Sequence, residues 1–198
     1  MITVSTSANR SASYHHGDLR EALVVAGLAI LEEGGDPKAL SLREATRRAG
    51  VSAMAPYRHF ADKDALLAAV ATIGFQRLRE ALLAADGQGG GIMALREQGV
   101  AYVAFACANP ALFRLMFGSA TAKDDAMVAA SNASYAVMEE RVRSLVPADR
   151  VEDWALHCWA TAHGLAALAV DGQFDDTAET IEAMTRRVMS LGAVPAVC

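Results

Sequence analysis

The sequence lacks both the alternating β-branched runs that form strands and an apolar run long enough to span a membrane. A bilayer requires about 20 consecutive apolar residues, whereas residues 155–170, the longest candidate, are interrupted by His157, Thr161 and His163. The first 13 residues are rich in Ser and Ala and lack the apolar stretch of a signal peptide. We therefore expect no membrane contact, no export and a cytoplasmic location.

Cysteine is scarce. Cys107, Cys158 and Cys198 are the three cysteines, an odd number without a Cys-x-x-Cys pair, and this fits reduced thiols better than a disulfide framework. We expect Cys107 and Cys158 to be small core residues. The adjacent His15 and His16 have no nearby set of Cys or carboxylate ligands. No metal site and no cofactor are predicted.

Positive charge is in deficit overall, because 18 Lys and Arg residues face 23 Asp and Glu residues. The resulting net charge of −5 argues by itself against nucleic-acid binding. The deficit is uneven, however. Residues 1–63 contain eight basic and seven acidic residues, whereas residues 64–198 contain ten and sixteen. A small basic face near the N-terminus is therefore compatible with the composition.

Ala, Leu, Met, Arg and Glu dominate the segments between Gly and Pro residues, which predicts an all-α fold. Caps and helix breakers predict about nine helices. Their expected ranges are 18–34, 41–50, 52–60, 62–85, 92–108, 110–117, 122–146, 148–170 and 177–191.

The second and third of these segments predict a helix-turn-helix, since two short helices are separated by a three-residue turn that contains glycine. Ser41 and Glu44 form a capping box at the start of the second helix. Gly50 supplies a left-handed turn, Val51 anchors the elbow in the core, and Ser52 caps the next helix.

The segment from residue 52 to 60 is unusual for a core helix, because Tyr57, Arg58 and His59 are consecutive and only Phe60 is plainly apolar. A helix that reads DNA explains this composition better, since its amino end attracts phosphate and its rings reach phosphates or base edges. Pro56 lies four residues after the cap, so we expect it to leave the helix intact.

The stretch Ser41-Leu-Arg-Glu-Ala-Thr-Arg-Arg-Ala-Gly-Val-Ser52, followed after four residues by Tyr57-Arg-His-Phe-Ala-Asp-Lys-Asp-Ala-Leu66, resembles the TetR family of transcriptional repressors. The resemblance covers residues 18–71 and departs at Pro56, where the family more often has Leu or Ile. It implies a flexible tail (1–17), a three-helix DNA-binding domain (18–63), and an effector-binding and dimerisation domain (64–198) that starts with a connecting helix (64–85).

The resemblance also implies DNA contacts, residue by residue. Tyr57 and His59 match an aromatic residue that contacts phosphate and its His partner, and Lys63 matches the basic residue at the start of the next helix. Ser41 and Arg43 match positions that grip the backbone and an outer base edge. The remaining expected DNA-binding residues, which face the groove, are Ser52, Ala53 and Met54. Ala and Met offer only apolar contact to a thymine methyl, so DNA shape is expected to matter.

Other basic residues near this motif are interpreted by their position. Arg47 and Arg48 lie at the rear of the second helix, where a solvated face is the better interpretation than base reading. Arg10 is a candidate minor-groove arm, and His15 and His16 fit a segment that lies along phosphate.

Beyond residue 91, aromatic and Met side chains recur at roughly helical spacing and mostly predict core packing. The segment Trp159-Ala-Thr-Ala-His163-Gly164 resembles the Trp-His-Gly signature of one TetR subfamily, and residues 109–117 resemble another stretch of the same domain. The resemblance implies a small-molecule effector pocket. The expected effector-binding residues are Tyr102, Phe105, Phe113, Met116, Phe117, Tyr135, Met138, Trp159 and His163.

Two interpretations of this signature stay open. His163 is either a buried imidazole bonded to a backbone carbonyl or an effector contact. Gly164, in mid-helix, is expected to permit close helix approach, because glycine there costs about 1 kcal/mol relative to alanine.

The resemblance implies a homodimer through the helices 148–170 and 177–191, which would place two reading helices about 34 to 36 Å apart on a palindromic operator. The expected function is repression of transcription, released by a small-molecule effector and without enzymatic activity. One alternative is a helical enzyme or sensor that uses His157, Cys158 or His163. Others are a metal sensor at Asp171, Asp175 and Asp176, and a helical partner-binding protein without a DNA role. No nucleophile, base and orienting group occur at a recognisable spacing.

Overall fold

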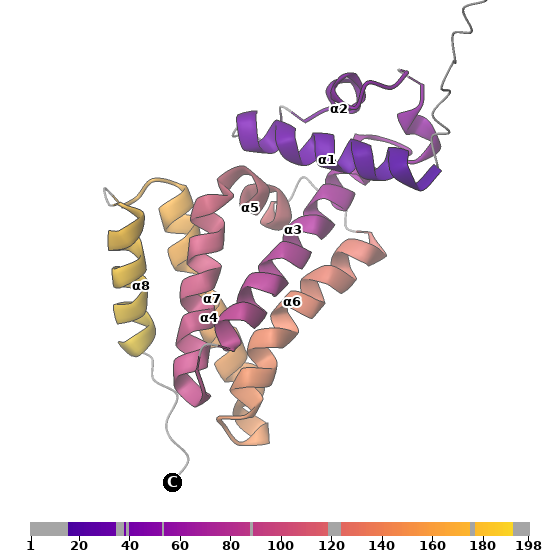
Figure 1. The fold of residues 1–198 in the computed structure, drawn as a ribbon. Coiled ribbons are helices and arrows are strands. Elements are labelled where there is room, and N and C mark those ends of the chain that lie inside the picture. The colour runs from indigo at the N-terminus through magenta and orange to yellow at the C-terminus, as the bar shows by residue number, and fades with distance from the viewer. Residues whose placement is uncertain are drawn as a thin grey trace, which may run out of the picture.

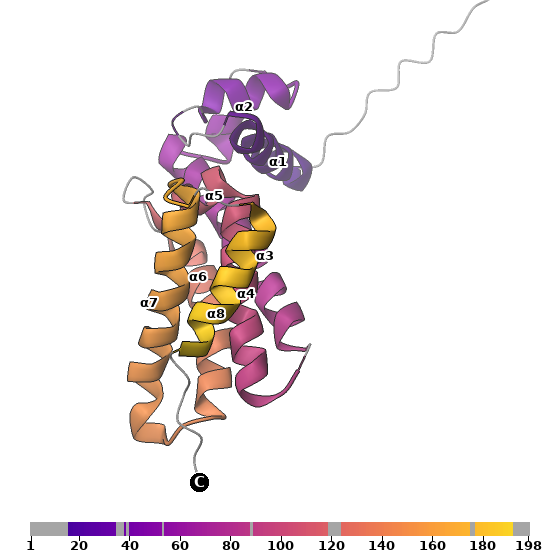
Figure 2. The same ribbon diagram turned by 90° about the vertical axis from the view of Figure 1, so that its left-hand side faces the viewer.

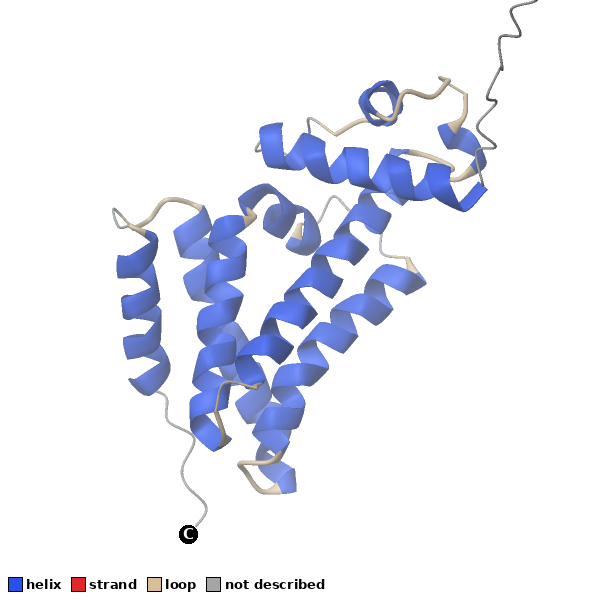
Figure 3. Cartoon of the chain, in the orientation of Figure 1, coloured by secondary structure: helices blue, strands red, loops and turns tan. Residues whose placement is uncertain are grey.

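The computed structural model describes residues 16–34, 38, 40–52, 54–87, 89–118, 124–174 and 177–191. Within these ranges the regular structure consists of eight α-helices and two short 3-10 helices, with no strand (Figure 3). The predicted all-α fold is confirmed. The expected count of about nine becomes eight, because residues 56–58 form a 3-10 turn in place of an α-helix.

The helices form a small head on an elongated body (Figure 1, Figure 2). The head consists of α1, α2, η2 and the first turns of α3, and the body consists of the rest of α3 with α4 to α8. Their bounds are α1 His16–Gly34, α2 Leu42–Arg48, η2 Pro56–Arg58, α3 Lys63–Asp86, α4 Gly91–Ala108, α5 Pro110–Phe117, α6 Asp125–Arg143, η3 Ala148–Arg150, α7 Val151–Val170 and α8 Ala178–Leu191.

Several helix ends follow the predicted caps, and three helices differ. The first helix, expected to begin at residue 18, begins at His16. The Asp62 carboxylate accepts a hydrogen bond from the Ala65 N–H at 2.9 Å and starts α3 as expected. The helix expected over 122–146 is shorter, because Asp124 caps its start and the chain turns after Arg143. The helix expected over 148–170 begins with the 3-10 turn η3, and α7 proper starts at Val151.

The longest helix, α3, joins the head to the body through one continuous hydrophobic core. In the head its Leu66 and Val70 pack with α1, where Gly27 allows close approach: a Cβ there would lie 2.9 Å from Val70 Cγ2. In the body its Phe75 and Leu78 are buried. The helix α3 therefore belongs to the packed core of both the head and the body.

The far end of α3 is fixed by a partly buried ion pair. Asp86 accepts two hydrogen bonds from Arg141 of α6, at 2.8 Å from Nε and 2.7 Å from Nη2. Gln98 of α4 donates to the same carboxylate at 2.7 Å. These hydrogen bonds, chiefly those from Arg141, lower the pKa of Asp86 below its ordinary value of 3.8.

Replacing Asp86 by Asn is expected to destabilise the fold by about 1 to 2 kcal/mol and to lower the melting temperature by roughly 2 to 8 °C at pH 7. The pKa of Asp86 is lower in the folded protein than in the unfolded chain. The Asp86–Arg141 pair therefore stabilises the fold above the unfolded-state pKa of Asp86, and this stabilisation is lost as the pH falls through the folded-state pKa. Thermal melts should therefore show a constant difference from pH 7 to about 5 that shrinks below about pH 4.

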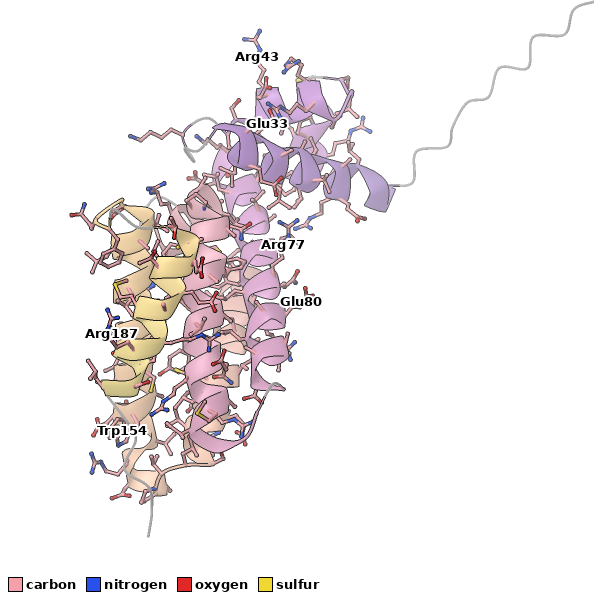
Figure 4. All side chains as sticks on the ribbon, turned by 60° about the vertical axis from the view of Figure 1, so that its left-hand side comes forward. Glu33, Arg43, Arg77, Glu80, Trp154 and Arg187 are labelled. Atoms are coloured by element: carbon pink, nitrogen blue, oxygen red, sulfur yellow. The ribbon has the colours of Figure 1, made fainter. Side chains whose placement is uncertain are left out.

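The control for this prediction is Glu80→Gln, since Glu80 is an exposed carboxylate on the same helix with no ion pair among the described residues (Figure 4). The melting temperature of Glu80→Gln should match that of the wild type across the same pH range. Equal melting of Asp86→Asn and wild type at pH 7 would contradict the stabilising role of the Asp86–Arg141 pair.

Candidate functional site

The turn from α2 to residue 52 has the local structure that the sequence predicts. Ser41 caps α2, and its Oγ accepts a hydrogen bond from the Glu44 N–H at 3.2 Å. Only this half of the capping box forms, because the Glu44 carboxylate bonds to arginines instead. Gly50 has a φ of +66°, in the left-handed region, and Val51 packs partly buried against the core.

The three arginines of α2 differ in their pairing. Arg43 is exposed, points away from the body (Figure 4), and makes no hydrogen bond or ion pair with any residue that the structure describes. Arg47 Nη2 lies 2.6 Å from Glu44, whose pKa is lowered to about 2 chiefly by the hydrogen bonds from Arg47 and Arg48. Arg48 also pairs with Glu33 of α1 at 2.7 Å. Arg43 is thus free to contact an anion, whereas its two neighbours are paired.

The α-helix expected over residues 52–60 is wrong, and Pro56 is the reason. In an α-helix the Pro56 N–H would bond to the Ser52 carbonyl, but proline has no N–H to donate. The Ala55 N–H bonds to that carbonyl at 2.9 Å instead, which gives 3-10 geometry. One α-type bond follows, from the Phe60 N–H to the Pro56 carbonyl at 2.9 Å. The segment is a compact helical turn rather than a rod.

This turn is anchored on one side and exposed on the other. Phe60 is 2% exposed and lies beneath the Arg20 guanidinium of α1, 5.4 Å from the ring centroid. Tyr57 and Met54 are 55% and 72% exposed. Ser52 is exposed as well. Burial of Phe60 therefore fixes the turn while large side chains remain available to a partner.

Three further predicted DNA-binding residues have different surroundings. His59 is half-buried, and its Nε2 is buried without a hydrogen-bond partner among the described residues, so this nitrogen is not exposed to a ligand in this conformation. Lys63 is the first residue of α3 and is partly exposed. Ala53 lies outside the described residues, as do Arg10 and His15.

A second candidate site is a cavity of about 400 Å³ lined by residues of α3, α4, α6, α7 and α8 and by the last residue of α5, in the body. Its size falls within the range of small-molecule sites. Apolar and aromatic side chains such as Phe75 and Leu78 form most of its wall. Its few polar groups include Arg96, Gln98 and Ser134.

Five of the nine predicted effector-binding residues line this cavity: Tyr102, Phe117, Tyr135, Met138 and Trp159. The other four do not. Phe113 and His163 border a separate, shallower pocket of about 170 Å³. Met116 is buried against Gly74 of α3, and Phe105 packs half-buried against the core.

His163 does not bond to a backbone carbonyl, as one sequence interpretation had it, but lies with its Nδ1 2.8 Å from the Tyr102 hydroxyl. Burial lowers the pKa of His163 and raises that of Tyr102. The neutral imidazole is thus the favoured form, and in the tautomer with an unprotonated Nδ1 it accepts a hydrogen bond from the tyrosine hydroxyl. This pair fixes the orientation of Tyr102 at the wall of the cavity.

The close helix approach that the sequence predicts at Gly164 is not found among the described residues of the single chain. A Cβ at this position would meet no atom within 4 Å, and the residue is exposed. No helix of the same chain approaches it closely, so the close approach expected there does not occur inside one protomer.

The site residues predicted from the sequence did not include Arg96, Gln98 and Phe75, which line the cavity, or Arg58, which is exposed in the head. The signal for the first two was present, because residues 96–98 are the only consecutive charged or amide residues in an otherwise apolar helix. Arg58 is exposed, adjoins Tyr57 and makes no ion pair within the described ranges.

The remaining chemistry in the described residues is sparse. No group of three or more His, Cys, Asp or Glu side chains there is arranged to hold a metal ion, although Asp175 and Asp176 lie outside the described part. Burial raises the pKa of Cys158 to about 11, so its thiol is protonated at neutral pH.

No single described helix is long and apolar enough to cross a membrane. The pair α4 and α5 passes that test by length and composition only together, with a bend of 108° between them.

Comparison with known proteins links both regions to one family. Residues 23–70 match the model of bacterial regulatory proteins of the tetR family, and residues 95–191 match the model of the tetracyclin repressor-like C-terminal domain. Together the two matches cover well over half of the chain. Comparison with curated proteins gives no significant match.

Solved structures are similar over nearly the whole chain. A protein of unknown function from Rhodococcus sp. RHA1 is 34% identical, with a TM-score of 0.76, and the alignment covers 92% of this chain and 98% of that one. A bacterial regulatory protein in the TetR family from Rhodococcus RHA1 is 19% identical, with a TM-score of 0.66 and coverage of 90% and 98%. The TetR family transcriptional regulator PfmR from Thermus thermophilus is 16% identical, with a TM-score of 0.63 and coverage of 93% and 98%. The two family models and this shared architecture show that the chain belongs to the TetR family of bacterial regulatory proteins.

Proposed function

We propose that this chain is a homodimeric transcriptional repressor that binds a palindromic operator and is released by a small-molecule effector. The DNA-binding domain would comprise residues 18–63, after a tail of residues 1–17, and the effector-binding and dimerisation domain residues 64–198. The observation that carries the proposal is that Arg43 and Tyr57 are exposed on a helix-turn-helix whose supporting helix, α3, also forms a wall of the cavity. Within the family we assign the chain to the subfamily with a Trp-His-Gly signature, here Trp159, His163 and Gly164.

Dimerisation through α7 and α8 is supported by an exposed stripe on α7. Leu156, Ala160, Gly164 and Leu168 recur every four residues, and all four are exposed in the single chain. Small residues at helical spacing let two helices approach closely, and exposed large apolar side chains such as Leu156 and Leu168 favour burial. A two-fold pair of α7 helices would bury this stripe.

Release of DNA would act through α3. Phe75, Leu78 and Leu82 contribute to the cavity wall, whereas Leu66 and Val70 belong to the core of the head. An effector that binds best to one position of α3 shifts the population toward that position. Since both heads must meet successive turns of one DNA face, a small change in their separation lowers affinity for the operator.

We propose no catalytic role. A protonated Cys158 thiol is a weak nucleophile, and the His163 Nδ1 is engaged by Tyr102. His157, which lines the cavity, remains as a polar group for ligand binding. Because the DNA target of a bacterial regulator lies in the cytoplasm, we place the protein there.

The proposal predicts that the protein binds an inverted repeat in the DNA upstream of its own gene with strong salt dependence. Three cations in each head, Arg43, Arg58 and Lys63, would give about six phosphate contacts for the dimer. Affinity should then fall by roughly 10³-fold between 50 and 200 mM salt. Fluorescence anisotropy with a labelled duplex and a scrambled duplex measures this. Equal affinity for both duplexes would contradict operator recognition.

A further inference from the structure

The cavity is lined by two residues that each have a buried polar atom without a hydrogen-bond partner among the described residues. The Nε of Arg96 and the Oε1 of Gln98 are buried, and neither forms a hydrogen bond in the described structure. Gln98 is only 1% exposed, and its amide nitrogen already donates to Asp86. An unpaired buried acceptor or donor destabilises the protein, and a charged group does so more strongly. Both side chains line the cavity, so a bound molecule can supply the missing partners.

Arg96 is also electrostatically unbalanced. Among the described residues, no Asp or Glu lines the cavity. The carboxylate next to Arg96 in the sequence, Glu97, pairs with Arg186 of α8, and Asp86, which binds Gln98, pairs with Arg141. The one hydrogen bond from the Arg96 guanidinium goes to the Met93 sulfur at 3.6 Å, which is a weak acceptor. The Arg96 guanidinium is thus partly exposed at Nη1, has its Nε buried at the edge of a largely apolar cavity, and has no carboxylate partner among the described residues.

Helix geometry separates the two polar groups. Ile92, Leu95 and Gly99 form the stripe of α4 that faces the cavity. At about 100° per residue, Arg96 and Gln98 lie on opposite flanks of this stripe. Aromatic rings from other helices, among them Phe75, also line the cavity. A ligand that meets both groups must therefore be polar at two separated points and apolar between them.

We propose that the cavity binds an aromatic carboxylate, whose anionic end pairs with Arg96 and whose opposite end donates a hydrogen bond to Gln98 Oε1. This inference rests on the proposed function of the cavity as an effector site. The guanidinium offers two parallel donors to a carboxylate, which is the strongest arrangement for such a pair. The ring system fills the apolar space between the two ends.

The test uses 6-hydroxy-2-naphthoate, which carries a carboxylate and a hydroxyl at opposite ends of a rigid ring system, and its neutral methyl ester. Isothermal titration calorimetry on the full-length protein should show at least about tenfold tighter binding of the carboxylate. Arg96→Met should abolish this preference by weakening the carboxylate and sparing the ester, while Arg96→Lys keeps part of it. The matched control is Arg79→Met, which removes an exposed cation of α3 that does not line the cavity.

The Gln98 arm compares 6-hydroxy-2-naphthoate with 2-naphthoate, and the wild type should prefer the hydroxylated compound several-fold, a preference that Gln98→Met removes. Equal binding of acid and ester by the wild type, or binding of neither, overturns the inference and needs no variant to fold. Fluorescence anisotropy of the labelled operator in the presence of each compound tests effector release separately from the ligand class. Release of DNA by the ester as well as by the acid overturns the anion requirement and leaves effector release standing. Tight, Arg96-dependent binding without release of DNA supports the ligand class and contradicts the release mechanism.

Discussion

A variant in which Arg43 and Tyr57 are both alanine is expected to lose operator affinity by roughly a hundredfold or more while it melts at the wild-type temperature. Each operator half-site would lose one charge-assisted contact and one aromatic contact, and a single such contact contributes about 1 to 3 kcal/mol. The fold should be unaffected, because both side chains are exposed and Arg43 has no partner within the described chain. Anisotropy titration of a labelled operator and thermal denaturation give the two readouts.

The matched control is Arg47→Ala, which removes the same charge from the same helix. Arg47 is 70% exposed, but it already pairs with Glu44, so its loss should change operator affinity only a few-fold. If Arg47→Ala weakens binding as much as the double variant, the DNA contact depends on net charge rather than on Arg43 and Tyr57. If the double variant binds like the wild type, this face of the head is not the DNA-binding face.

The head was predictable from the sequence to the extent that backbone chemistry is local. Ser41, Gly50 and Asp62 each act through bonds or torsions within a few residues, and each is found where its residue type predicts. The geometry of residues 52–60 was not predicted correctly, because two preferences conflict there. The motif favours a helix, whereas the missing N–H of Pro56 removes its first α-type bond, and the structure resolves the conflict as a 3-10 turn.

The cavity was predictable only in part, because its wall is assembled from helices far apart in the chain. Aromatic spacing finds apolar side chains but does not say which of them face a core and which face a cavity. Trp159 and His163 share a helix face, yet Trp159 lines the cavity and His163 borders a different pocket. The informative signal was the opposite one: Arg96 and Gln98 interrupt an apolar helix, and polar residues at buried positions need partners.

Replacing Gly164 by Arg is expected to convert the proposed dimer to a monomer at micromolar concentration and to lower operator affinity by at least about a hundredfold. The substitution is compatible with the folded protomer, since Gly164 is exposed and a Cβ there meets no atom within 4 Å. In a two-fold pair of α7 helices, however, the new side chains would place two positive charges and their bulk between backbones that must approach closely. A monomer contacts one half-site alone, so most of the binding free energy of the second is lost.

The control for this prediction is Ala136→Arg, which adds the same side chain at an exposed position of α6, a helix that does not belong to the proposed interface. Sedimentation equilibrium should give a dimer for Ala136→Arg and a monomer for Gly164→Arg, with equal melting of the folded protomers. A dimer that persists in Gly164→Arg would exclude the α7 stripe as the interface. It would also leave the exposed side chains of Leu156 and Leu168 without a surface that buries them, because no described helix of the same chain covers them. Operator affinity of the dimeric Gly164→Arg variant then separates two cases. If its affinity is unchanged, the two-fold contact lies on another face. If its affinity is lost, Gly164 affects the separation of the two heads within the dimer.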